Sequence, residues 1–105
     1  MSLNAELRAF YDSRQQQIPA GIRAVMHRAG RELADSGQAD RALSVGAAAP
    51  GFSLPSASGK TVALGELLAD GPVVLTFYRG AWCPYCNLAL RSLQQHHEDW
   101  WRRLE

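Results

Sequence analysis

Apolar residues recur at helical spacing through the first forty positions of the chain. Leu3, Leu7 and Phe10 follow one another at intervals of three or four, which predicts a first helix. Pro19 suits the first position of a second helix, and Gly37 suits the left-handed conformation that ends one. An apolar stripe on this second helix is interpreted as packing surface, and comprises Ile18, Ile22, Val25, Met26, Ala29 and Leu33. Residues 1–43 are therefore predicted to be a helical N-terminal extension.

The pattern changes to short strands and turns after residue 44. Pro50-Gly51 interrupts the chain, and residues 52–54 and 61–64 alternate between apolar and polar positions. The turn-rich segment 56–60 separates these two runs, so the pattern predicts a β-hairpin. A short helical turn is expected at 66–69.

A continuous apolar run, Val73 to Tyr78, is rich in β-branched and aromatic residues. Such a run is typical of a central strand that is buried on both faces. A loop follows, and Pro84 can open a new helix with Cys83 near its N-cap. The order of elements predicts an α/β fold, in which residues 44–105 form the second part of the chain.

Composition narrows the classes of function. The chain has 105 residues, 47% of them hydrophobic and 20% charged, with a net charge of +1, which is typical of one small globular domain. No basic stripe indicates a nucleic-acid partner, and no apolar run is long enough to span a membrane. The first residues lack the features of a secretory signal, so the cytoplasm is the expected location.

The two cysteines are only three positions apart, in Cys83-Pro84-Tyr85-Cys86. Free N–H groups and the helix dipole at a helix start favour a thiolate, which is the reactive form of cysteine. Cys86 would lie on the same helical face as Cys83, so one sulfur can attack and the other can close a disulfide. Arg79 is a further candidate source of positive potential.

The neighbours of the cysteines leave alternatives open. Trp82 either shields one side of the site or packs in the core, and Tyr85 contacts either a substrate or solvent. A zinc site with His96 and His97 is a competing interpretation of the cysteine pair. It is disfavoured within one chain, because the eleven residues from Cys86 to His97 correspond to about 16 Å of helix, whereas zinc ligands lie about 2 Å from the metal. We therefore expect no metal and no organic cofactor.

Several segments resemble one known family. Residues 45–55, the turn at 58–60, the run 71–80 and the Trp82–Cys86 motif are similar to the alkyl hydroperoxide reductase and thiol-specific antioxidant family, the peroxiredoxins of the thioredoxin superfamily. The resemblance implies a partial thioredoxin-like fold with N-terminal helices, a β-hairpin, a central strand and an active-site helix. It also implies that Arg79, Trp82, Pro84 and Tyr85 support the catalytic Cys83 and Cys86.

The resemblance leaves the order of attack open. Peroxiredoxins attack peroxide with the residue at the position of Cys86, whereas thioredoxins and glutaredoxins attack with the residue at the position of Cys83. The implied function is a thiol-dependent oxidoreductase with antioxidant activity. It would reduce hydroperoxides or disulfides at a redox-active centre and be regenerated by an external thiol reductant.

The end of the chain departs from the family pattern. After Gln94 the sequence continues through Trp100 and Trp101 to Glu105, without the later strands of a complete domain. We expect a truncated domain that is completed or stabilised as a homo-oligomer, since exposed tryptophans and an unpaired strand edge favour association. The alternative is a catalytically idle relative that acts as a self-associating interaction module.

Overall fold

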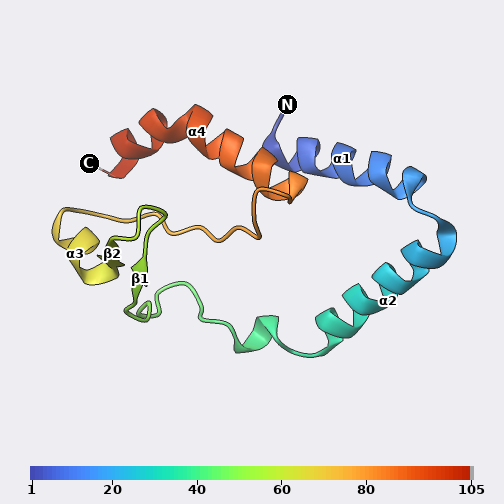
Figure 1. Ribbon diagram of the computed structural model, residues 1–105, viewed down its shortest axis with the longest axis horizontal. Coiled ribbons are helices and arrows are strands. Elements are labelled where there is room, and N and C mark those ends of the chain that lie inside the picture. The colour runs from blue at the N-terminus through green and yellow to red at the C-terminus, as the bar shows by residue number, and fades with distance from the viewer. Residues whose placement is uncertain (105) are drawn as a thin grey trace. The chain divides into compact units, whose positions relative to one another are not determined.

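The computed structural model describes residues 1–104, apart from the side chains of residues 101 and 104. The chain divides into two units. The first contains residues 1–42 and 78–103, and the second contains residues 43–77. Figure 1 labels the elements in chain order, from α1 in blue to α4 in red.

The first unit begins with the two predicted helices. Helix α1 spans Leu3–Gln17 and starts at Ser2, whose hydroxyl accepts a hydrogen bond from the Ala5 N–H at 3.3 Å. Such a cap satisfies one of the free donors at a helix start. Helix α2 spans Ala20–Asp35, so Pro19 stands at the N-cap rather than at the first helical position.

Polar contacts link α1 to α2. The His27 ring nitrogen Nε2 lies 3.3 Å from the Tyr11 hydroxyl and 2.9 Å from Gln15 Oε1. The Arg23 guanidinium donates to the Gln15 carbonyl at 2.8 Å. His27 is therefore an exposed, hydrogen-bonded histidine that joins the two helices.

The end of α2 also follows the sequence pattern. Gly37 has φ of +75°, in the left-handed region that glycine adopts without steric cost. A short 3-10 helix, Ala39–Arg41, follows. The apolar stripe of α2 is not covered within the described residues, since Ile22, Val25, Met26 and Leu33 are all at least half exposed. The stripe was expected to pack against other parts of the chain, and the described residues of one chain do not cover it.

The second unit is built on the predicted hairpin. Strands β1 (Ser53–Pro55) and β2 (Thr61–Ala63) pair antiparallel, with Leu54 opposite Val62. Helix α3 (Leu64–Ala69) follows β2 directly and contains the expected helical turn. The Leu64 N–H donates to the Phe52 carbonyl at 3.0 Å, and the Leu64 side chain is buried.

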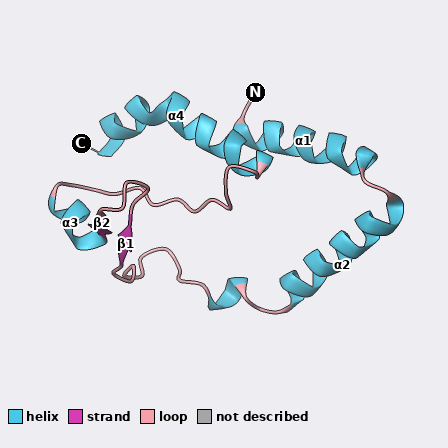
Figure 2. Cartoon of the chain, viewed as in Figure 1, coloured by secondary structure: helices cyan, strands magenta, loops and turns pink. Residues whose placement is uncertain are grey.

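The prediction of a central strand at residues 73–78 is wrong for the described structure. Residues 73–78 form no strand and are drawn as loop in Figure 2. They are not buried on both faces either, since Phe77 is 88% exposed and Tyr78 is 58% exposed. A strand exists only through pairing with a neighbour, and within residues 1–104 the sheet contains β1 and β2 alone.

Helix α4, Pro84–Leu104, ends the described chain. Trp100 near its end is 42% exposed, and the prediction of a buried contact for Trp101 concerns a side chain outside the described part. In residues 1–104, no helix has the length and apolar composition that crossing a bilayer requires. The only apolar or sulfur side chains buried there are those of Leu64 and Cys83.

We expect Leu64→Ala to loosen the hairpin. Truncating a buried leucine costs about 2 kcal/mol or more, so the Ser56 amide, which donates to the Lys60 carbonyl at 2.7 Å, should exchange its hydrogen at least about thirtyfold faster. Leu68→Ala in the same helix is the control, since Leu68 is 51% exposed. Equal exchange rates in the two variants would show that Leu64 does not stabilise this unit.

Candidate functional site

The cysteine motif opens helix α4. The Cys83 N–H donates to the Gly80 carbonyl at 3.0 Å, and the Cys83 carbonyl accepts the first helical hydrogen bond from the Asn87 N–H at 3.0 Å. Cys83 is therefore at the N-cap, and Pro84 is the first helical residue, where its missing N–H costs nothing. The prediction of a sulfur at the start of a helix is confirmed.

The two sulfurs differ in their access to solvent. Cys83 is 2% exposed, whereas Cys86 is partly exposed, and both are free thiols. The Cys86 side chain acts on Cys83 and is the largest influence on its pKa. The Arg79 backbone N–H in the preceding loop donates a hydrogen bond to Cys86 Sγ, the more exposed sulfur, at 3.3 Å.

The surroundings lower the pKa of Cys83. The side-chain hydrogen bond from Cys86 is the largest cause, followed by the Cys86 backbone N–H. Burial acts in the opposite direction and raises the pKa, while the positive charge of Arg79 and the Tyr85 backbone N–H lower it further. The backbone donors at the start of α4 and the second thiol together stabilise the Cys83 thiolate more than the surroundings of an ordinary cysteine do.

The loop before the cysteines is organised around an arginine and a tryptophan. The Arg79 guanidinium lies 4.9 Å from the centre of the Trp82 ring, within the range of a cation–π contact. Trp82 is 68% exposed, which excludes the core-packing interpretation within one chain. The tryptophan thus supports the cation whose charge acts on Cys83.

Gly80 is required at its position for two reasons. Its φ is +141°, and a Cβ placed on it would lie 2.5 Å from Trp82 Nε1. Any other residue would have to displace the indole or the backbone. Asn87 holds the same loop from α4, since its amide donates to the Ala81 carbonyl at 2.9 Å. The sequence pattern did not identify either residue as part of the site.

Tyr85 lies partly buried between the two cysteines. Its ring meets the ring of Phe10 edge to face, with the centroids 5.1 Å apart and the planes at 88°. Phe10 comes from α1, so the extension contributes to the surroundings of the motif. Helical spacing had marked Phe10 only as an apolar position, and nothing local in the sequence indicates which element it contacts.

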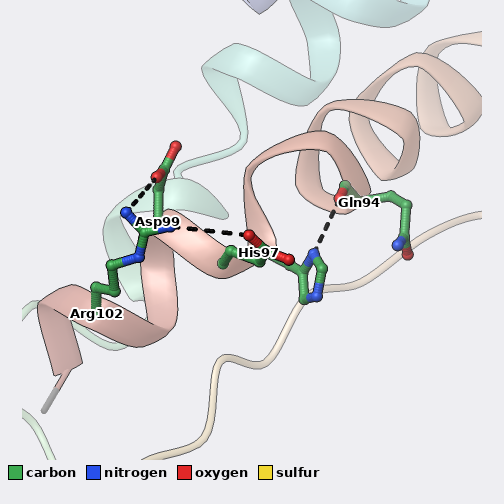
Figure 3. A network of polar contacts seen from close by, with 5 residues as sticks. Gln94, His97, Asp99 and Arg102 are labelled. Carbon is green, nitrogen blue, oxygen red and sulfur yellow. Dashed lines mark hydrogen bonds and ion pairs between the residues drawn. The ribbon is translucent and has the colours of Figure 1, made fainter.

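The two histidines of the zinc interpretation face their own helix. His96 Nδ1 lies 2.8 Å from the Ser92 carbonyl, and His97 Nδ1 lies 3.2 Å from the Gln94 carbonyl. Figure 3 shows the second contact beside the ion pair of Arg102 with Asp99, at 3.9 Å. No group of three or more potential metal ligands occurs among the described residues.

Comparison with known proteins shows the family of the chain. A model of the AhpC/TSA family matches residues 45–103, more than half of the sequence. The chain belongs to the AhpC/TSA family. Its α/β architecture is thus a partial thioredoxin-like fold, with the hairpin and the cysteine-bearing helix inside the matched segment. Comparisons with curated proteins and with solved structures returned no match.

Membership of the AhpC/TSA family gives the cysteine pair a chemical context. The family supports a peroxiredoxin-like thiol oxidoreductase, with peroxides and thiol reductants as its general partners. Helix α1 and helix α2 precede the segment that matches the family, whereas Arg79, Trp82 and both cysteines fall inside it.

Replacing Gly80 by alanine should disturb the Arg79–Trp82 stack. The strained backbone and the clash with the indole should lower the free energy of unfolding by about 1–3 kcal/mol. The indole N–H resonance of Trp82, assigned with Trp82→Phe, should also move. Gly51→Ala is the control, because a Cβ there meets no atom and the backbone is unstrained. An unmoved resonance in Gly80→Ala would contradict the described loop.

The lowered pKa of Cys83 predicts a pH profile for its alkylation. Labelling of Cys83 by iodoacetamide should be slow at every pH because the side chain is only 2% exposed, but its rate should fall through a midpoint below the ordinary cysteine value of about 8.5, because the thiolate is the nucleophile. Arg79→Gln should raise the midpoint of the profile, and Cys86→Ala should raise it further. Labelling at each cysteine is followed by mass spectrometry.

Arg28→Gln is the matched control for this profile, since Arg28 is an exposed arginine on α2. It should leave the midpoint unchanged. A midpoint for the intact protein at the ordinary cysteine value of about 8.5 would contradict the described environment of Cys83.

Proposed function

We propose that the chain reduces hydroperoxides with Cys86 and Cys83 as a dithiol–disulfide pair, and that an external thiol regenerates it. The observation that carries this proposal is the pair of free thiols in the first turn of α4, with one sulfur buried and the other partly exposed, together with the lowered pKa of Cys83 to which Cys86 contributes most. Two sulfurs in contact can pass between dithiol and disulfide without a large rearrangement.

Access to solvent favours Cys86 as the sulfur that meets the oxidant. Cys83 is only 2% exposed, so a bulky substrate cannot reach it in the described conformation. In the reactive form the negative charge lies on Cys86, because the thiolate is the nucleophile. The Arg79 N–H then stabilises that charge.

The first step transfers oxygen to sulfur. The Cys86 thiolate attacks the terminal oxygen of the hydroperoxide, the O–O bond breaks, and the released alkoxide takes a proton to become an alcohol. Cys86 is oxidised to a sulfenic acid by two electrons, and the peroxide is reduced by the same two.

The second step closes the disulfide. Cys83 loses its proton and attacks the Cys86 sulfur, the S–O bond breaks, and hydroxide leaves as water after protonation. Two equivalents of an external thiol then reduce the Cys83–Cys86 disulfide and are themselves oxidised to a disulfide. Arg79 lowers the pKa of Cys83 and so favours the attacking form in this step. Trp82, Pro84 and Tyr85 hold the loop and the first helical turn around the sulfurs.

The exposed apolar surface supports a second part of the proposal. Only Leu64 and Cys83 are buried among the described residues with apolar or sulfur side chains, while the α2 stripe and Phe77 are open to solvent. We propose that the chain works as a homo-oligomer that covers this surface. The free thiols fit a reducing compartment, and the cytoplasm is the proposed location.

The same surface favours one alternative, a self-associating module whose cysteines are idle. Peroxide consumption with a thiol reductant separates the two functions. The enzyme should consume hydrogen peroxide well above the background of the Cys83→Ser/Cys86→Ser double variant, whereas an idle module should match that background.

Single variants test the two roles. Cys86→Ser should lower the rate of peroxide reduction at least about a hundredfold, because no partly exposed thiol then remains among the described residues. Cys83→Ser should still react once and stop with a sulfenic acid on Cys86, which dimedone traps for mass spectrometry. A sulfenic acid found on Cys83 in Cys86→Ser, at the rate of the intact protein, would reverse the assignment.

A further inference from the structure

Helix α1 contacts the cysteine motif although it precedes the segment that matches the family. The ring of Phe10 meets the ring of Tyr85 at a centroid distance of 5.1 Å, in the edge-to-face geometry that aromatic pairs prefer. Glu6, one turn earlier on α1, lies 3.8 Å from the Arg91 guanidinium on α4. Two contacts one helical turn apart on α1 therefore fix it against the first turns of α4.

The aromatic contact is the stronger of the two. The side chains of Arg91 and Glu6 are 61% and 32% exposed, and an ion pair with this exposure contributes little. Phe10 and Tyr85 are each partly buried. On α1 itself, the Arg14 guanidinium lies 5.8 Å from the centre of the Phe10 ring, within the range of a cation–π contact.

Tyr85 connects this contact to the chemistry. It lies between the two cysteines in the chain, and its backbone N–H is one of the groups that lower the pKa of Cys83. A side chain that fixes the Tyr85 ring also limits the freedom of the Tyr85 backbone. Loss of the Phe10 ring would therefore let the donors of this turn move away from the sulfur.

We propose that helix α1 is a working part of the redox site and that Phe10 is a positioning residue, which acts through Tyr85 to hold the turn of Cys83 and Cys86. This inference rests on the proposed function and extends it to a segment outside the family match. Phe10 touches no reacting atom. It sets how well the first turn of α4 stabilises the thiolate that the reaction uses.

The charged groups around this turn come from three elements. Arg79 lies in the loop before the cysteines, and Arg14 lies near the Phe10 ring on α1. Glu6 on α1 forms an ion pair with Arg91 on α4. Replacing Phe10 by an apolar residue changes none of these charges. A shifted ionisation of Cys83 in such a variant would therefore report geometry rather than lost charge.

The test is the ionisation of the cysteines in Phe10→Ala, followed through the ultraviolet absorbance of the thiolate. This readout counts ionised sulfurs whether or not a reagent can reach them. The first ionisation constant should fall about two- to tenfold, the range that the strength of an aromatic pair allows. Alanine favours helix, so α1 should persist, and circular dichroism checks this.

Two variants sharpen the result. Tyr11→Ala is the matched control, since the neighbouring Tyr11 contacts His27 instead of Tyr85, and it should leave the ionisation constant unchanged. Phe10→Tyr keeps the ring and should restore the value of the intact protein. In a Tyr85→Ala background, where the partner ring is gone, Phe10→Ala should have no further effect.

An ionisation constant in Phe10→Ala equal to that of the intact protein would overturn the inference, as would an equal shift in Tyr11→Ala. Both outcomes are distinct from failure of the proposed function, because the titration needs neither peroxide nor turnover. If the variants ionise as expected but the intact protein consumes no peroxide, the enzymatic proposal is rejected. The positioning role of Phe10 is then still supported.

Discussion

The influence of the Cys86 side chain on Cys83 at the start of α4 is the interaction on which the functional account depends. It acts between the partly exposed Cys86 and the buried Cys83 and is the largest cause of the lowered pKa of Cys83. Several local features serve this interaction. The backbone N–H of Arg79 donates to Cys86 Sγ, and the Asn87 amide donates to the Ala81 carbonyl in the loop. Gly80 allows the loop backbone to pass close to the Trp82 indole. The site is thus assembled mainly from residues 79–87, within one turn and its preceding loop.

This local assembly contrasts with the sparse packing elsewhere. Few side chains in residues 1–104 are buried, and the α2 stripe and the run 73–78 are exposed. A chain of this length hides only a limited part of its surface on folding, and the proposed homo-oligomer would cover these groups. The cysteine site depends less on such packing, because its donors come from the first turn of a helix and from neighbouring loop residues.

The sequence predicted the local features well and the long-range ones poorly. Pro84 after Cys83 predicted the helix start, Gly37 predicted the end of α2, and the alternation around residues 56–60 predicted the hairpin, because each depends on nearby residues. The strand at 73–78 was predicted from composition and was wrong, since a strand also needs a partner whose presence composition does not reveal. The contact of Phe10 with Tyr85 joins positions 75 residues apart, and the burial of Cys83 depends on how the loop folds back. Neither has a signature in the local sequence.

The most direct test of the central claim is the product of mild oxidation of the purified protein with diamide. Trypsin cleaves after Arg79 and Arg91, so both cysteines lie in one peptide. If the sulfurs are in contact, that peptide should become lighter by two hydrogen atoms, and the disulfide should form within one chain at a rate independent of protein concentration. Disulfides that form only between chains, or two cysteines that remain free thiols, would contradict the account.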